Sequence, residues 1–124
     1  MSQLISQNQL DRSKEEEKFV LLTAEQVRKD FAMFGMEVFF SGNTSLAYEE
    51  LFTQLSVYIE QLLNDNYEKL MSLLYQIDIN QKELIKPAPE QNFQSVPEII
   101  THKILERELK KVLTRAYFKE KGNN

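Results

Sequence analysis

The clearest pattern in the chain is a row of apolar residues between about Leu46 and Asn64 that recurs every three or four positions. The row consists of Tyr48, Leu51, Phe52, Leu55, Tyr58, Ile59, Leu62 and Leu63. This spacing places the row on one side of an α-helix, and no Gly or Pro interrupts the stretch. Thr44 or Ser45 offers the side-chain oxygen that caps a helix N-terminus. We therefore expect a long amphipathic helix here.

A second helix is expected directly after the first. Asp65, with Glu68 three positions later, has the pattern of a new N-cap, and apolar residues follow at helical spacing up to about Ile77. The connection is only about three residues long, which favours an antiparallel return. The pattern predicts an αα-hairpin over residues 46–77, held by large side chains that each contribute roughly 1.5 to 3 kcal/mol when fully buried.

An earlier helix is predicted from about residue 24 to residue 34. Thr23 begins a capping-box pattern, and Gly35 supplies the left-handed conformation in which many helices end. The next five residues, 36–40, are β-branched and aromatic, which suits an extended piece, and residues 41–43 have the composition of a turn.

A final long helix is predicted from a capping box at Ser95 to about Lys119. Its apolar positions point in two directions more than 100° apart, so its two halves should face different neighbours. Before it, Asn80 can cap a short helical turn over residues 81–86, and residues 87–92 form a Pro-containing linker.

Composition supports one small helical domain. The chain is 42% hydrophobic and 27% charged, within the globular range, and its three Gly and three Pro favour few, long elements. Residues 1–18 are rich in Gln, Ser and charged groups and are predicted to form a flexible N-terminal arm. The prediction is an all-α bundle of about four helices over residues 19–119, with the hairpin at its centre and a disordered tail at 120–124.

The residue types argue against catalysis. There is no Cys, which excludes disulfides and thiolate sites, and His102 is the only histidine, which leaves no usual zinc site. No Gly-rich phosphate loop, nucleophile elbow or calcium loop is present. No secretory signal or membrane span is recognised. We expect a cytoplasmic protein that is not an enzyme and has no metal or cofactor.

The final helix carries a basic face. Its members are Lys103, Arg107, Lys110, Lys111 and Arg115. The net charge of the chain is -4, yet from His102 onward seven Lys and Arg stand against three Glu. Such a face could neutralise nucleic-acid phosphates or an acidic partner. Alternatively, the cations simply collect where a helix dipole favours them.

The second candidate surface is the segment FAMFGMEVFF at residues 31–40, which holds four of the eight Phe and two of the four Met. Phe34, Met36 and Phe39 are its candidate contact residues. Aromatic and thioether groups of this kind suit a partner helix. The same density of apolar groups is also typical of a core, so the pattern leaves both interpretations open.

The segments LMSLLYQIDINQKEL and PEIITHKILERELKKV resemble small uncharacterised helical proteins of bacteria over about half of the chain. The resemblance implies a helical hairpin, an irregular linker and a closing charged helix, and no activity. The leading hypothesis is a non-catalytic protein-interaction module, an accessory or adaptor subunit of a bacterial assembly that binds a protein partner or a second copy. The alternative is a nucleic-acid-associated regulator that uses the basic face.

Overall fold

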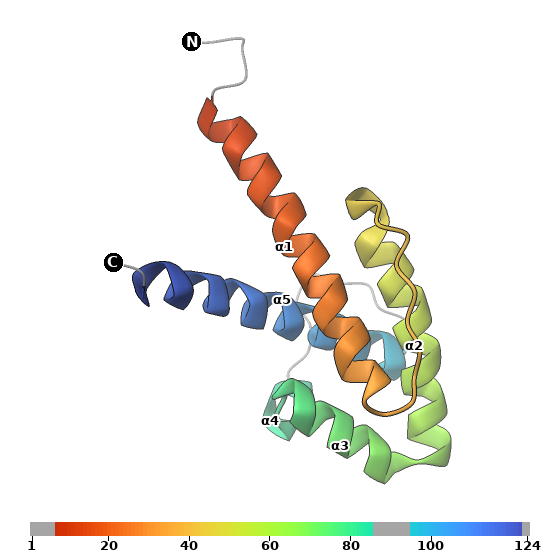
Figure 1. Ribbon diagram of the computed structural model, residues 1–124. Coiled ribbons are helices and arrows are strands. Elements are labelled where there is room, and N and C mark those ends of the chain that lie inside the picture. The colour runs from red at the N-terminus through yellow and green to blue at the C-terminus, as the bar shows by residue number, and fades with distance from the viewer. Residues whose placement is uncertain (1–6, 86–94, 123–124) are drawn as a thin grey trace.

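The computed structural model describes residues 7–85 and 95–122, and within them every regular element is a helix (Figure 1). The elements are α1 (Gln7–Ala32), the 3₁₀ helix η1 (Thr44–Leu46), α2 (Ala47–Asp65), α3 (Tyr67–Ile77), α4 (Gln81–Ile85) and α5 (Val96–Gly122). The predicted all-α bundle with a long C-terminal helix is confirmed.

Helix α5 packs against the hairpin formed by α2 and α3. It packs extensively against both α2 and α1 and also contacts α3, and Figure 1 shows it crossing α1 while α3 and α4 lie below. Its first half meets α2, α3 and α4, whereas its second half meets α1, through contacts described below. The prediction that the two halves face different neighbours is therefore confirmed.

Helices α2 and α3 pack against each other across the single residue Asn66, as the predicted helix pair requires. Asn66, and not Asp65, caps α3, because Asp65 is still the last residue of α2, and Asn66 Oδ1 accepts a hydrogen bond from Lys69 N–H at 3.1 Å. At the other end of α2, Asn43 caps the preceding η1 by accepting from Ser45 N–H at 3.1 Å. Both predicted caps were wrong by one or two residues.

The capping box predicted at Thr23 is wrong, because Thr23 lies inside α1 and its hydroxyl donates to the Phe19 carbonyl at 2.7 Å. The end of α1 and the caps of α4 and α5 agree with the sequence pattern. Gly35 has a φ of 76° just after α1. Asn80 Oδ1 accepts from Glu83 N–H at 3.0 Å at the start of α4, and the Ser95 hydroxyl donates to Glu98 Oε1 at 3.0 Å at the start of α5. The linker predicted at residues 87–92 lies outside the described residues.

Helix α1 begins at Gln7, far before the predicted start at residue 24. It therefore includes residues 7–18 of the predicted flexible arm, and α5 likewise includes residues 120–122 of the predicted tail. Nucleation is the costly step of helix formation, so a helix anchored by buried residues extends readily through good helix formers such as Glu, Lys and Gln. Few apolar residues in 7–18 therefore did not prevent these residues from being helical.

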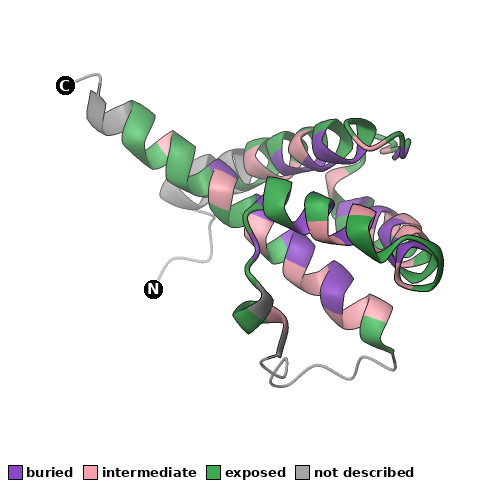
Figure 2. Ribbon diagram, turned by 90° about the horizontal axis from the view of Figure 1, so that it is seen from below, coloured by how far each residue is buried: buried purple, intermediate pink, exposed green. Residues whose placement is uncertain are grey.

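One core joins α1, α2, α3, α5 and the segment after α1. Its fully buried apolar side chains are Val27, Phe31, Leu55, Ile59, Leu70, Leu73, Ile77 and Ile104. Figure 2 shows the buried positions on the sides of the helices that face one another, and mostly exposed positions along the end of α5 that leads to the C-terminus.

Candidate interaction site

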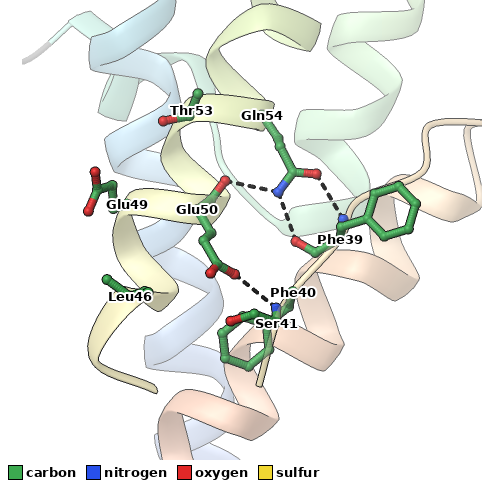
Figure 3. Close-up of a pocket in the computed structure, with 8 residues that line it drawn as sticks. All are labelled: Phe39, Phe40, Ser41, Leu46, Glu49, Glu50, Thr53 and Gln54. Atoms are coloured by element: carbon green, nitrogen blue, oxygen red, sulfur yellow. Dashed lines mark hydrogen bonds between the residues drawn. The ribbon is translucent and has the colours of Figure 1, made fainter. Parts of the chain in front are cut away.

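Residues 36–41 run as an extended segment along α2, and side chains of α2 bind its backbone (Figure 3). Gln54 binds Phe39 twice: its Oε1 accepts from the Phe39 N–H at 2.8 Å, and its Nε2 donates to the Phe39 carbonyl at 2.8 Å. On either side, Glu50 Oε1 accepts from Ser41 N–H at 2.9 Å, and the Tyr58 hydroxyl donates to the Glu37 carbonyl at 2.6 Å.

The spacing of these contacts explains why the segment lies flat on α2. Residues 50, 54 and 58 are each about 6 Å apart along the helix axis, since four residues rise by 1.5 Å each. Residues 41, 39 and 37 are each about 6.6 Å apart along an extended chain. These two distances are nearly equal. The side chains of residues 50, 54 and 58, which lie in one row of α2, can therefore bind the backbone of every second residue of the segment. On the other edge, Arg28 Nε of α1 donates to the Val38 carbonyl at 2.9 Å.

Replacing Gln54 with Ala should loosen this segment. The change removes two hydrogen bonds to Phe39, each contributing about 0.5 to 1.5 kcal/mol, so the free energy of unfolding should fall by about 1 to 3 kcal/mol. Urea unfolding measures this value, and amide hydrogen exchange should speed up at Phe39. Gln61→Ala, an exposed site on α2, serves as the matched control. Equal stability of the two variants would contradict the role given to Gln54.

Beside the segment lies an open hollow of about 660 Å³ at the start of α2 (Figure 3). The residues that line it are Phe39, Phe40, Ser41, Leu46, Glu49, Glu50, Thr53 and Gln54. In Figure 3 the Phe40 ring points towards Leu46, and the Phe39 ring projects on the other side of the segment. Leu46 and Phe39 are exposed, at 42% and 66%. The hollow thus combines an apolar wall with the carboxylates of Glu49 and Glu50.

The structure divides the aromatic segment 31–40 between core and surface. Met36 is 5% exposed and belongs to the core, and Phe34 is half-buried against it. Of the three predicted contact residues, only Phe39 has an exposed side chain. Alternation explains this division, because side chains of an extended chain point to opposite sides, so that Val38 is buried while Phe39 is exposed.

Most of the predicted basic face is engaged within the chain. Lys103 Nζ donates to the Glu83 carbonyl, and Arg107 Nη2 lies 2.6 Å from Asp78 Oδ2. Lys111 Nζ lies 3.2 Å from Glu108 Oε1. Arg115 Nη1 donates to Gln26 Oε1 at 2.7 Å. The contacts of Lys103, Arg107 and Arg115 join α5 to α4, to Asp78 at the end of α3, and to α1. Among the described residues of this face, Lys110 is exposed and has no such partner. The cations therefore serve mainly to dock α5.

A buried polar cluster at the junction of α1 and α5 was missed by the sequence analysis. Asp30 and Glu108 are 1% and 0% exposed, and Lys111 Nζ lies 3.6 Å from Asp30 Oδ2 and 3.2 Å from Glu108 Oε1. Gln26 Nε2 donates to Asp30 Oδ1 at 3.0 Å. No donor in the described chain satisfies Asp30 Oδ2 or either oxygen of Glu108 with regular hydrogen-bond geometry.

Burial raises the pKa of Glu108, a hydrogen bond to Asp30 and the charge of Asp30 also raise it, and Lys111 lowers it, so that the pKa is about 8. At neutral pH Glu108 is therefore protonated and can donate to Asp30. The cluster then holds one negative and one positive charge, from Asp30 and Lys111. Because Glu108 is fully buried, its protonation state affects the stability of the α1–α5 junction and not the binding of another molecule.

His102 lies where α5 packs against α2. It is half-buried on α5, with Nδ1 3.0 Å from the Tyr48 hydroxyl of α2 and Nε2 3.4 Å from Glu106 Oε1. Burial, together with the Glu106 carboxylate, raises the pKa of Tyr48. These contacts link α2 to α5. Within residues 7–85 and 95–122, no group of three or more His, Asp or Glu could hold a metal ion.

Comparison with known proteins finds no family model, no curated protein and no solved structure that matches this chain. None of the described helices combines the length and the hydropathy that crossing a bilayer requires.

Proposed function

We propose that this chain is a non-catalytic protein-interaction module, an accessory or adaptor subunit that binds a basic amphipathic segment in the hollow at the start of α2. The observation that carries the proposal is that the apolar side chains of Phe40 and Leu46 line the same hollow as the acidic residues Glu49 and Glu50. From residue 30 to residue 68 the chain has seven acidic residues and no Lys, Arg or His. An apolar centre with a complementary charged rim is the usual anatomy of a recognition site.

Rigidity also supports binding at this place. The bonds from Gln54 and Glu50 hold the backbone of Phe39 and Ser41 against α2, so the aromatic residues are positioned before a partner arrives. Ordering of a flexible loop costs free energy on association, and a surface that is already fixed avoids that cost. An exposed Phe on a fixed backbone is well suited to serve as an anchor for a partner.

The nucleic-acid alternative has less support from the same contacts. Each of the four cations Lys103, Arg107, Lys111 and Arg115 contacts a group within the chain. Two of those groups are carboxylates, Asp78 beside Arg107 and Asp30 beside Lys111. A phosphate backbone would have to compete with these partners. It would also meet the acidic surface of α2 elsewhere on the same small domain.

The proposal is tested with a fluorescent peptide that places Lys and Leu at helical spacing. We expect saturable binding that weakens with added salt, since exposed charges are screened. A matched peptide with Glu in place of every Lys should not bind, and neither should a DNA duplex. Binding of the duplex but not of the Lys peptide would overturn the proposal in favour of the alternative.

Two substitutions locate the binding site. Leu46→Ser removes apolar wall while leaving a residue that suits a helix N-terminus, and Glu49→Lys reverses the rim charge. Each should weaken binding of the Lys and Leu peptide about tenfold, which corresponds to about 1.4 kcal/mol. Glu60→Lys, an exposed reversal further along α2, is the control and should change binding much less. Unchanged affinity in both hollow variants would place the site elsewhere.

A further inference from the structure

The C-terminal part of α5 carries exposed apolar groups beyond the packed bundle. Figure 1 shows this end of the helix extending away from α2 and α3, and Leu109, Leu113, Tyr117 and Phe118 are 39%, 42%, 57% and 65% exposed. The first half of the same helix buries Ile100, Ile104 and Leu105. Exposed apolar residues concentrated on a projecting helix end indicate a surface that another protein covers.

The charge of this end is opposite to that of the hollow. From His102 onward Lys and Arg outnumber Glu by seven to three, whereas residues 30–68 contain only acidic charges. Lys110 and Lys119 are exposed, and among the described residues neither has a partner within the chain. Glu49 is exposed on the rim of the hollow. One chain thus contains both a basic, aromatic helix end and an acidic, apolar hollow.

These two surfaces do not meet within one molecule. In Figure 1 the C-terminal end of α5 and the start of α2 lie on opposite sides of α1. Contact between them consequently requires two molecules. If the C-terminal end of α5 of each molecule binds in the hollow of the other, the two contacts are related by a twofold axis and form a closed dimer.

We propose that a second copy of this chain occupies the hollow, with the end of its α5 placing Tyr117 and Phe118 against Phe40 and Leu46 and its Lys110 and Lys119 near Glu49. The inference rests on the proposed function, because it uses the same hollow, and it names the partner as the chain itself. Burial of aromatic residues supplies affinity, and the opposite charges favour this pairing over others.

The test uses two charge-reversed variants of the full chain, studied by sedimentation velocity at low salt over a range of concentrations. Wild type should associate as concentration rises. Glu49→Lys alone, and Lys110→Glu with Lys119→Glu, should each weaken self-association at least about tenfold, because each places like charges together. An equimolar mixture of the two variants should associate about as well as wild type, since its heterodimer restores opposite charges at both contacts. Lys82→Glu, an exposed reversal on α4, is the control.

Recovery in the mixture cannot come from misfolding, so it would support the proposal directly. A wild-type chain that stays monomeric at every concentration would overturn it, as would association that both charge-reversed variants leave unchanged. A monomer that still binds the Lys and Leu peptide would overturn only the second copy as occupant and leave the proposed function standing. A chain that stays monomeric and does not bind the Lys and Leu peptide would overturn both the second copy as occupant and the proposed function.

Discussion

Raising the pH from about 4.5 to about 8 is expected to lower the free energy of unfolding through Glu108, by roughly 1 kcal/mol per pH unit. The unfolded carboxyl ionises near pH 4.5, whereas in the folded chain burial, together with the neighbouring Asp30, raises the pKa of Glu108 to about 8. Between these values the folded state binds one more proton than the unfolded state. The stability from this proton is complete below pH 4.5 and is lost as the pH rises through 8.

Replacing Glu108 with Gln should abolish this pH dependence. The amide is close in shape to the protonated carboxyl group and can also donate to Asp30, so the variant should be more stable than wild type at pH 8 and above. Urea unfolding of both proteins between pH 5 and pH 9 gives the difference at each pH, which cancels the contributions of other groups. Glu60→Gln on the exposed surface is the control. Parallel curves for wild type and Glu108→Gln would contradict the raised pKa.

The positions of α2, α3 and α5 followed from the sequence because their apolar residues recur at helical spacing and their ends carry recognisable capping residues. The observed N-cap residue differs from the predicted one where two neighbouring polar residues can both cap the helix. Asn43 and Asn66 each adjoin another good capping residue, and the choice depends on where the helix is anchored by packing. The early start of α1 was missed because a helix that is already anchored extends through polar residues.

The candidate site was visible in the sequence only as an aromatic segment. Three polar residues at 50, 54 and 58 do lie in one row of a helix, but nothing local shows that their partners are the backbone groups of residues 37–41. Glu108 illustrates the same limit. In the stretch ERELKK it has the pattern of a solvated charge, and only packing of α5 against α1 reveals that it is buried beside Asp30.

Replacing Lys111 with Met is expected to destabilise the protein by about 3 to 5 kcal/mol at neutral pH. The Lys111 ammonium is the cation of the buried cluster, 3.6 Å from Asp30 and 3.2 Å from Glu108. Removing one partner of a buried ion pair leaves the other charge without compensation, which costs far more than an exposed pair contributes. A loss of this size is a large fraction of the 5 to 15 kcal/mol by which domains are typically stable.

Comparison with the neighbouring lysine separates the cluster from a general effect of charge. Lys110→Met removes the same charge from an exposed position and should change stability by no more than about 0.5 kcal/mol. Combining Lys111→Met with Asp30→Asn should recover most of the loss, because no buried charge then remains while Glu108 stays protonated. Urea unfolding at pH 6 measures all four proteins. If Lys111→Met is as mild as Lys110→Met, Asp30 does not depend on this cation, and the junction of α1 and α5 is held by its apolar contacts alone.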